Sequence, residues 1–169
     1  TFDSQLSFSQ HVDTVCRIAY FHMRSMRHVR SCLPPRVLQT VACSIINAKL
    51  DYCNSLLYGT TGANIAKLQL VQNSLARLVT GKRRFDHITP VLSELHWLPV
   101  SYRIVYKLAT ITHRTLSTAQ PAYLSTCLHR YQPSRTLRSA AHNRLLQPDI
   151  RNYRIDFSHR GFLNSAPTI

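Results

Sequence analysis

Apolar residues return every three or four positions over most of the chain, which is the spacing of amphipathic helices. From about Ser7 to Cys32 this spacing predicts one helix, with cations gathered near its C-terminal end. The pair Pro34-Pro35 ends it, and Pro35 suits the first position of a second helix that runs from Arg36 toward Gly59. The residues predicted to face inward are Val12, Val15, Cys16, Ala19, Met23 and Met26, then Val37, Leu38, Val41, Ala42, Ile45, Ile46, Leu50, Cys53, Leu56 and Leu57.

Four further helical segments follow, each marked by a start or stop signal. Gly81 is predicted to cap the first, because glycine readily adopts the left-handed backbone that ends many helices. Thr89-Pro90, Pro99 and Pro121 are typical of helix starts. The predicted segments run from about Asn64 to Thr80 (with Ile65, Leu68, Val71, Leu75 and Leu78 inward), Thr89 to Leu95, Pro99 to Leu116 (with Ile104, Val105, Leu108 and Ile111 inward) and Pro121 to Leu128.

The periodicity fades beyond Tyr131. Arginines are scattered there among Pro, Ser and Asn, which predicts a basic extension with a short strand or two. The pattern as a whole predicts an all-α fold, an irregular bundle of about five helices with a loose basic C-terminal extension. We expect a helical domain over residues 1–130 and the extension over residues 131–169.

The charge balance adds a candidate partner to this picture. Lys and Arg total 21 against 7 for Asp and Glu, a net charge of +14, while the hydrophobic fraction of 44% is enough for a core. Such an excess favours nucleic acid as the partner, with an anionic membrane surface as the second candidate. Arginine predominates, and its guanidinium suits bidentate contact with phosphate. No apolar run is long enough to span a bilayer and no signal-peptide pattern is present. Of the two candidate partners we choose nucleic acid and expect no membrane partner.

Metal and nucleophile chemistry find little support in the sequence. The five cysteines include no Cys-x-x-Cys pair, and Cys16, Cys43 and Cys53 lie in largely apolar helical stretches. We interpret them as buried thiols of a reducing, intracellular compartment, nuclear or cytoplasmic. The spacing of His22, His28 and Cys32 matches no familiar zinc site, so no metal site is predicted.

The carboxylates are too widely separated in sequence to predict a catalytic metal centre. No Tyr-x-Asp-Asp sequence occurs either. Asp51, in an otherwise apolar stretch, is instead predicted to bond to a nearby Arg or a backbone amide. We therefore predict no catalytic residue and no enzymatic activity for this chain alone. The seven acids are Asp3, Asp13, Asp51, Asp86, Glu94, Asp149 and Asp156.

The basic positions are better candidates for function. Arg103 and Lys107 share one helix face at four-residue spacing, and a cationic run follows the helix that ends at Thr80. The alternative is that they are ordinary solvated helix faces. Trp97 is interpreted as a core anchor rather than a base-stacking residue. The candidate nucleic-acid-binding residues are Arg24, Arg27, Arg30, Arg77, Lys82, Arg83, Arg84, Arg103, Lys107, Arg114 and Arg138.

Several stretches, in matching order, carry a resemblance to a known family. They are Thr1–Val12, Leu50–Gly59, Lys67–Arg77, His87–Leu92 with Leu95–Ile104, Leu137–Ser139 and Phe162–Pro167. Together they resemble the region that follows the polymerase palm in LINE-type (non-LTR) retrotransposon reverse transcriptases, most closely those of the chicken-repeat and jockey-like clades. The resemblance spans nearly the whole chain.

That resemblance implies a helical thumb and connecting region of a longer polyprotein, an RNA-directed DNA polymerase. The palm's metal-binding aspartates and an endonuclease would lie upstream, so Mg²⁺ is expected only there and this chain needs no cofactor. The implied partners are that palm and endonuclease, and a template–primer duplex of RNA and DNA held through its phosphates. The alternative is a structural or interaction fragment, or a degenerate relic, without independent activity.

Overall fold

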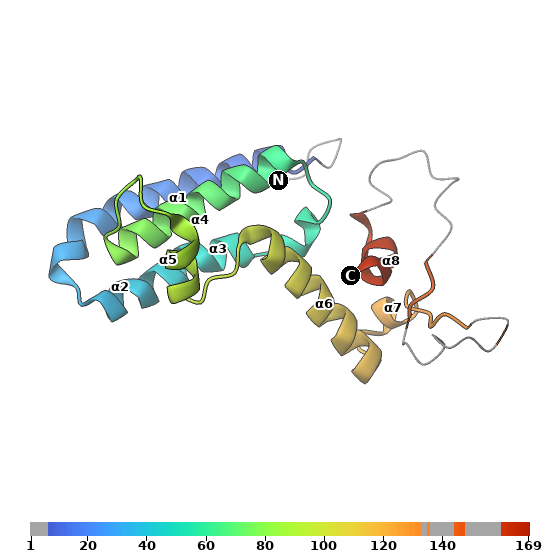
Figure 1. Cartoon of the computed structure of the whole chain (residues 1–169). Helices are drawn as coiled ribbons and strands as arrows, with labels where there is room; N and C mark the ends of the chain where they lie inside the picture. The colour runs from blue at the N-terminus through green and yellow to red at the C-terminus, as the bar shows by residue number, and fades with distance from the viewer. Residues whose placement is uncertain (1–6, 133–134, 136–143, 148–159) are drawn as a thin grey trace. The chain divides into compact units, whose positions relative to one another are not determined.

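The computed structural model of the chain describes residues 7–132, 135, 144–147 and 160–169. Within these residues the secondary structure is helical and contains no strand, only an isolated antiparallel bridge between Arg130 and Leu145 (Figure 1). The all-α prediction is therefore confirmed. In the described part of the chain, no helix is both long and apolar enough to cross a membrane.

The helices begin and end close to the positions that proline, glycine and apolar spacing predict. The exception is the predicted second helix, which is broken into α2, a π-helical segment at Cys43–Asn47, α3 and a 3-10 turn at Asn54–Leu57. The α-helices are α1 (Ser9–Val29), α2 (Pro35–Ala42), α3 (Ala48–Asp51), α4 (Gly62–Thr80), α5 (Ile88–Glu94), α6 (Val100–Thr118), α7 (Ala122–Ser125) and α8 (Phe162–Ser165).

The chain forms two compact units. The first comprises Thr1–Asn54 and Thr60–Ile104, and the second comprises Ser55–Gly59 and Val105–Ile169, so the boundary falls inside α6. The division predicted after residue 130 stays a prediction, because much of 131–169 lies outside the described residues. The second unit buries Leu108, Thr112, Thr115, Leu128 and Ala166.

The core of the first unit is built on α1 and α4, which run side by side (Figure 1). The predicted inward face of α1 is confirmed except for Cys16, which is half-buried. A fully buried Val, Leu or Met side chain stabilises the fold by ~1.5–3 kcal/mol relative to an exposed one. The buried apolar residues of the two helices are Val12, Val15, Ala19, Met23 and Met26 of α1, and Leu68, Val71, Leu75, Ala76, Leu78 and Val79 of α4.

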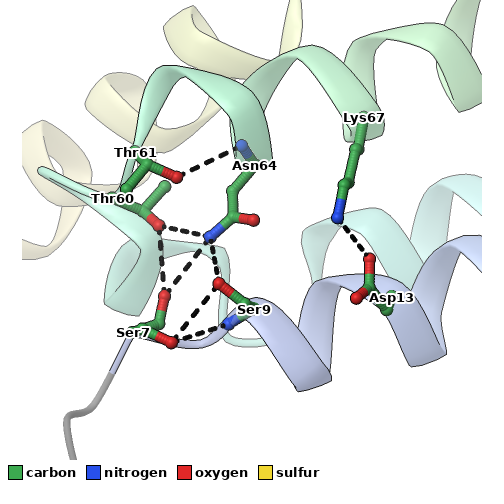
Figure 2. Close-up of polar contacts among 7 residues, drawn as sticks. All are labelled: Ser7, Ser9, Asp13, Thr60, Thr61, Asn64 and Lys67. Atoms are coloured by element: carbon green, nitrogen blue, oxygen red, sulfur yellow. Dashed lines mark hydrogen bonds and ion pairs between the residues drawn. The ribbon is translucent and has the colours of Figure 1, made fainter.

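Polar contacts at the start of α1 and α4 show that the two helices are parallel (Figure 2). The Asn64 amide nitrogen lies 3.3 Å from the Ser7 carbonyl oxygen and 3.3 Å from the Ser9 hydroxyl. One turn on, the Lys67 ammonium donates to Asp13 at 2.7 Å, and this bond raises the pKa of Lys67. Residues near the start of each helix thus meet, so their C-terminal ends lie at the same end of the unit.

A buried glutamine holds the turn between α5 and α6 against α4. The Gln72 side chain is fully buried, and its amide donates to the Leu98 carbonyl at 2.8 Å. Gln69 accepts from the Val100 backbone N–H at 2.9 Å and donates to Gln72 at 3.0 Å. Trp97, the residue before Leu98, is buried, which confirms its interpretation as a core anchor.

Some residues predicted to face inward do not. The buried face of α6 follows Ile104, Leu108, Thr112 and Thr115, so Val105, about 100° around the helix from Ile104, is exposed. Cys53 is exposed as well, because the helix has ended and its backbone is left-handed, with φ 53°. Other predicted inward residues that the structure exposes are Val37, Ile45 and Leu56, because the buried face through α2 and α3 is narrower than the apolar one.

Replacing Gly81 should destabilise the fold. Gly81 caps α4 with φ 77° and donates its N–H to the Arg77 carbonyl at 2.8 Å. Gly81→Ala should lower the free energy of unfolding by ~1–2 kcal/mol, the cost of left-handed backbone for an L-residue. Gly62→Ala is the matched control, since Gly62 starts α4 with nothing within 4 Å of an added Cβ. Urea titration of both variants tests this, and equal stabilities would contradict it.

Candidate nucleic-acid interface

The parallel arrangement of α1 and α4 places two groups of candidate nucleic-acid-binding cations at one end of the first unit. Arg24 and Arg27 lie near the end of α1, and Arg30 begins the 3-10 turn that follows. Lys82 directly follows Gly81, the residue that caps α4. The Arg30 guanidinium lies so close to Gly81 that a Cβ added there would meet it. Residues about fifty positions apart in the sequence thus become neighbours, and all four cations are exposed.

Three of these cations line an open groove of about 840 Å³, whereas Arg24 lies outside its lining and its predicted phosphate contact stays a prediction. Arg27, Arg30, Arg36 and Lys82 lie around it, and Glu94 is the one acid among the described residues that line it. Its apolar walls come from Leu33, Leu38, Val79 and Leu95.

Arg36 is a groove residue that the sequence reasoning missed. It lies in the first turn of α2, directly after Pro35, where the positive end of the helix dipole disfavours a cation. Cations at the ends of α1 and α4 complement their helix dipoles, so local helix stability explains them in part. It does not explain Arg36. A cation in the first turn of a predicted helix can be recognised from the sequence alone, so this signal could have identified Arg36.

Among the residues that the structure describes, no acid forms an ion pair with a groove cation. The two ion pairs among the described residues are Lys67–Asp13 and Arg103–Asp51, and neither involves the groove. The Asp86 carboxylate accepts from the backbone N–H of Arg83 at 2.6 Å. A hollow lined by one sign of charge concentrates its field and attracts ions of the opposite sign. The arrangement therefore suits a polyanion.

Other predicted site residues have different surroundings. Arg77 is half-buried and donates to the Asp86 carbonyl at 3.4 Å, so it braces the loop after α4. Arg83 and Arg84 are exposed in that loop, and Lys107 and Arg114 are exposed on α6. Arg138 lies outside the described residues. The phosphate-binding role of each of these stays a prediction.

Arg103 is already engaged inside the first unit. Its guanidinium pairs with the Asp51 carboxylate and donates to the Asn47 amide oxygen at 3.3 Å, and its side chain is 17% exposed. The bond predicted between Asp51 and a nearby Arg is therefore confirmed. The same pair occupies the guanidinium that was predicted to face phosphate.

Among the described residues, no group of three or more His, Cys, Asp or Glu side chains is placed to hold a metal ion. Burial raises the pKa of the Cys16 thiol, and the nearby Asp13 carboxylate raises it further. A raised pKa lowers the thiolate fraction and hence nucleophilicity. The groove itself presents guanidinium and ammonium groups, which suit ionic binding.

The Asp51–Arg103 pair should make a measurable contribution to stability. In a double-mutant cycle, Asp51→Ala and Arg103→Ala should be coupled by ~0.5–1.5 kcal/mol in urea unfolding, discounted because Asp51 is 44% exposed. The cycle Asp13→Ala with Lys67→Ala is the matched control. That coupling should be smaller, since both side chains are about half exposed, at 59% and 48%. Additive effects at Asp51 and Arg103 would contradict the expectation.

No family model matches the sequence, and no curated protein or solved structure is detectably similar to it. The case for a nucleic-acid interface therefore rests on the charges and geometry of this chain.

Proposed function

We propose that this chain holds nucleic acid through its phosphate backbone, with the groove at the C-terminal ends of α1 and α4 as the contact surface. One observation carries the proposal: parallel packing gathers Arg27, Arg30, Arg36 and Lys82 around one open groove in which Glu94 is the acid. Three of the four cations are arginines, whose planar guanidinium can donate two hydrogen bonds to one phosphate.

Such a surface binds without reading sequence. Phosphate contacts position a protein on a strand or duplex but carry no direct base information. Their free energy comes largely from release of condensed counterions, so binding must weaken as salt rises. A net charge of +14 adds long-range attraction to the same polyanion.

The resemblance to non-LTR reverse transcriptases suggests the kind of protein in which this binding would operate. In a polyprotein of that kind, the chain would hold a template–primer duplex beside an active site supplied by upstream sequence. We expect the chain alone to have no polymerase activity, and Mg²⁺ to act only at the upstream palm.

A structural role is the second candidate. It is favoured by Arg103, whose guanidinium is held by Asp51 and Asn47, so at least one predicted phosphate contact serves the fold. In that reading the helices brace neighbouring parts of a longer protein. Salt dependence separates the two candidates, since a brace has no reason to bind polyanions.

Binding to a short DNA duplex should be strongly salt-dependent. Four phosphate contacts at 0.9 per contact give a slope of log affinity against log salt of about −3.6. Fluorescence anisotropy over a salt series measures it. A flat response, or no binding at low salt, would overturn the proposal. Tighter binding to anionic lipid vesicles than to the duplex would assign the groove to a membrane surface.

The variant Arg36→Glu should weaken nucleic-acid binding without lowering the stability of the fold. Losing a charge-assisted contact should weaken duplex binding about tenfold or more and flatten the slope by about 0.9. An acid in the first turn of α2 should leave stability unchanged or slightly raised. The control is Arg17→Glu, an equal change of charge at an exposed position of α1 that does not line the groove. Equal losses in the two variants would mean that net charge, not the groove, drives binding.

Removing the groove acid should strengthen binding. Glu94 is exposed near the end of α5 and would repel a phosphate held by Lys82. Glu94→Gln keeps the side-chain shape and should raise duplex affinity about threefold, as expected for loss of one partly screened repulsion. The measurement is the same titration, with Asp13→Asn as the control outside the groove. Unchanged affinity in Glu94→Gln would place the phosphates elsewhere.

A further inference from the structure

Phe85 is held in an exposed position beside the basic groove. Its side chain is 92% exposed, the highest value among the large hydrophobic residues of the described chain. It directly follows the cations Lys82, Arg83 and Arg84. An aromatic ring left in water contributes none of the burial energy that usually accounts for such residues, so folding gives no reason for it.

The loop that carries Phe85 is pinned on both sides of the ring. The Asp86 backbone N–H donates to the Arg83 carbonyl at 3.2 Å, and the Asp86 carboxylate accepts from the Arg83 backbone N–H at 2.6 Å. From α4, the Arg77 guanidinium donates to the Asp86 carbonyl at 3.4 Å. These bonds span residues 83–86, so they fix the backbone on either side of the ring.

A second, smaller hollow lies at this ring. It has a volume of about 350 Å³, and Phe85, His87, Pro90 and Val91 line it. Lys82 and Glu94 line this hollow and the basic groove alike, so the two are adjacent. A planar, partly apolar group in the hollow would thus lie next to an anion in the groove, which is the arrangement of base and phosphate within one nucleotide.

We propose that Phe85 stacks on an unpaired nucleobase, so that the groove prefers single-stranded RNA or DNA, or an unpaired end, to a fully paired duplex. This inference rests on the proposed binding of the phosphate backbone by the groove. In a duplex the faces of each base are covered by its neighbours, so an aromatic side chain gains little from them. In a single strand each face is open, and an aromatic platform beside cations binds it with little sequence preference.

The surroundings of Phe85 favour a base over a protein partner. Protein interfaces place an aromatic anchor within a contiguous apolar patch. The residues next to Phe85 in the loop, Arg83, Arg84, Asp86 and His87, are polar and exposed. An exposed aromatic ring beside several cations is typical of single-strand binding surfaces.

The test compares three ligands with the full chain by fluorescence anisotropy. They are an oligothymidylate of about a dozen nucleotides, an abasic strand of the same length, and a matched duplex. Phe85→Ala should weaken binding to the oligothymidylate about tenfold and leave the other two within about twofold. Its salt slope should not change, because removing a neutral ring releases no ions. Phe85→Trp should keep the affinity, and Tyr52→Ala, at another exposed aromatic, should leave all three unchanged.

Each outcome bears on a distinct claim. Equal losses on all three ligands would show that Phe85 shapes the loop, and would overturn the stacking inference. No loss on any ligand, with salt-dependent binding intact, would overturn the stacking inference and leave the proposed phosphate binding by the groove standing. Absence of binding by the unsubstituted chain at low salt would overturn both. Loss confined to the strand that carries bases supports the inference.

Discussion

The buried amide of Gln72 is the constraint on which the placement of the later helices in the first unit depends. A fully buried side-chain amide must find partners, and an unsatisfied one costs ~1–3 kcal/mol. Gln72 finds them in the Leu98 carbonyl and in Gln69, which in turn accepts from the Val100 N–H. These bonds hold the turn between α5 and α6 against α4, and Trp97 is buried within that turn. An apolar residue at position 72 would fill the same space without specifying this turn.

The same placement accounts for Arg103 and Asp51. Once α6 begins at Val100, Arg103 lies one turn into it and reaches the end of α3, where Asp51 also accepts from the Asn54 amide at 3.3 Å. Asn54 is itself buried. The end of α3 is therefore tied to the first turn of α6 by an ion pair.

The hydrogen bonds and the ion pair of this network join three stretches that lie far apart in the sequence. Leu50–Gly59 supplies Asp51 and Asn54, Lys67–Arg77 supplies the two glutamines, and Leu95–Ile104 supplies the turn and Arg103. These residues bond to one another inside the first unit, so they serve the fold. The four groove cations lie outside all three stretches. The residues that hold this network together and the residues of the proposed binding surface are therefore different.

The sequence by itself determined most of the local structure, except for the breaks in the helix predicted from Arg36 toward Gly59. Pro35, Gly81 and the apolar spacing set the bounds of the other helices to within a few residues, because backbone restriction and helical periodicity act over short distances. It also gave the kind of partner that Asp51 needs, since a carboxylate in an apolar stretch must be paired. Only the tertiary structure decided that α1 and α4 run parallel, which brings Arg27 and Arg30 to Lys82, and that Arg36 joins them. It also decided that Val105 and Cys53 face outward. The physical reason is that periodicity shows which face of a helix is apolar, whereas direction and neighbours depend on contacts between residues far apart in the chain.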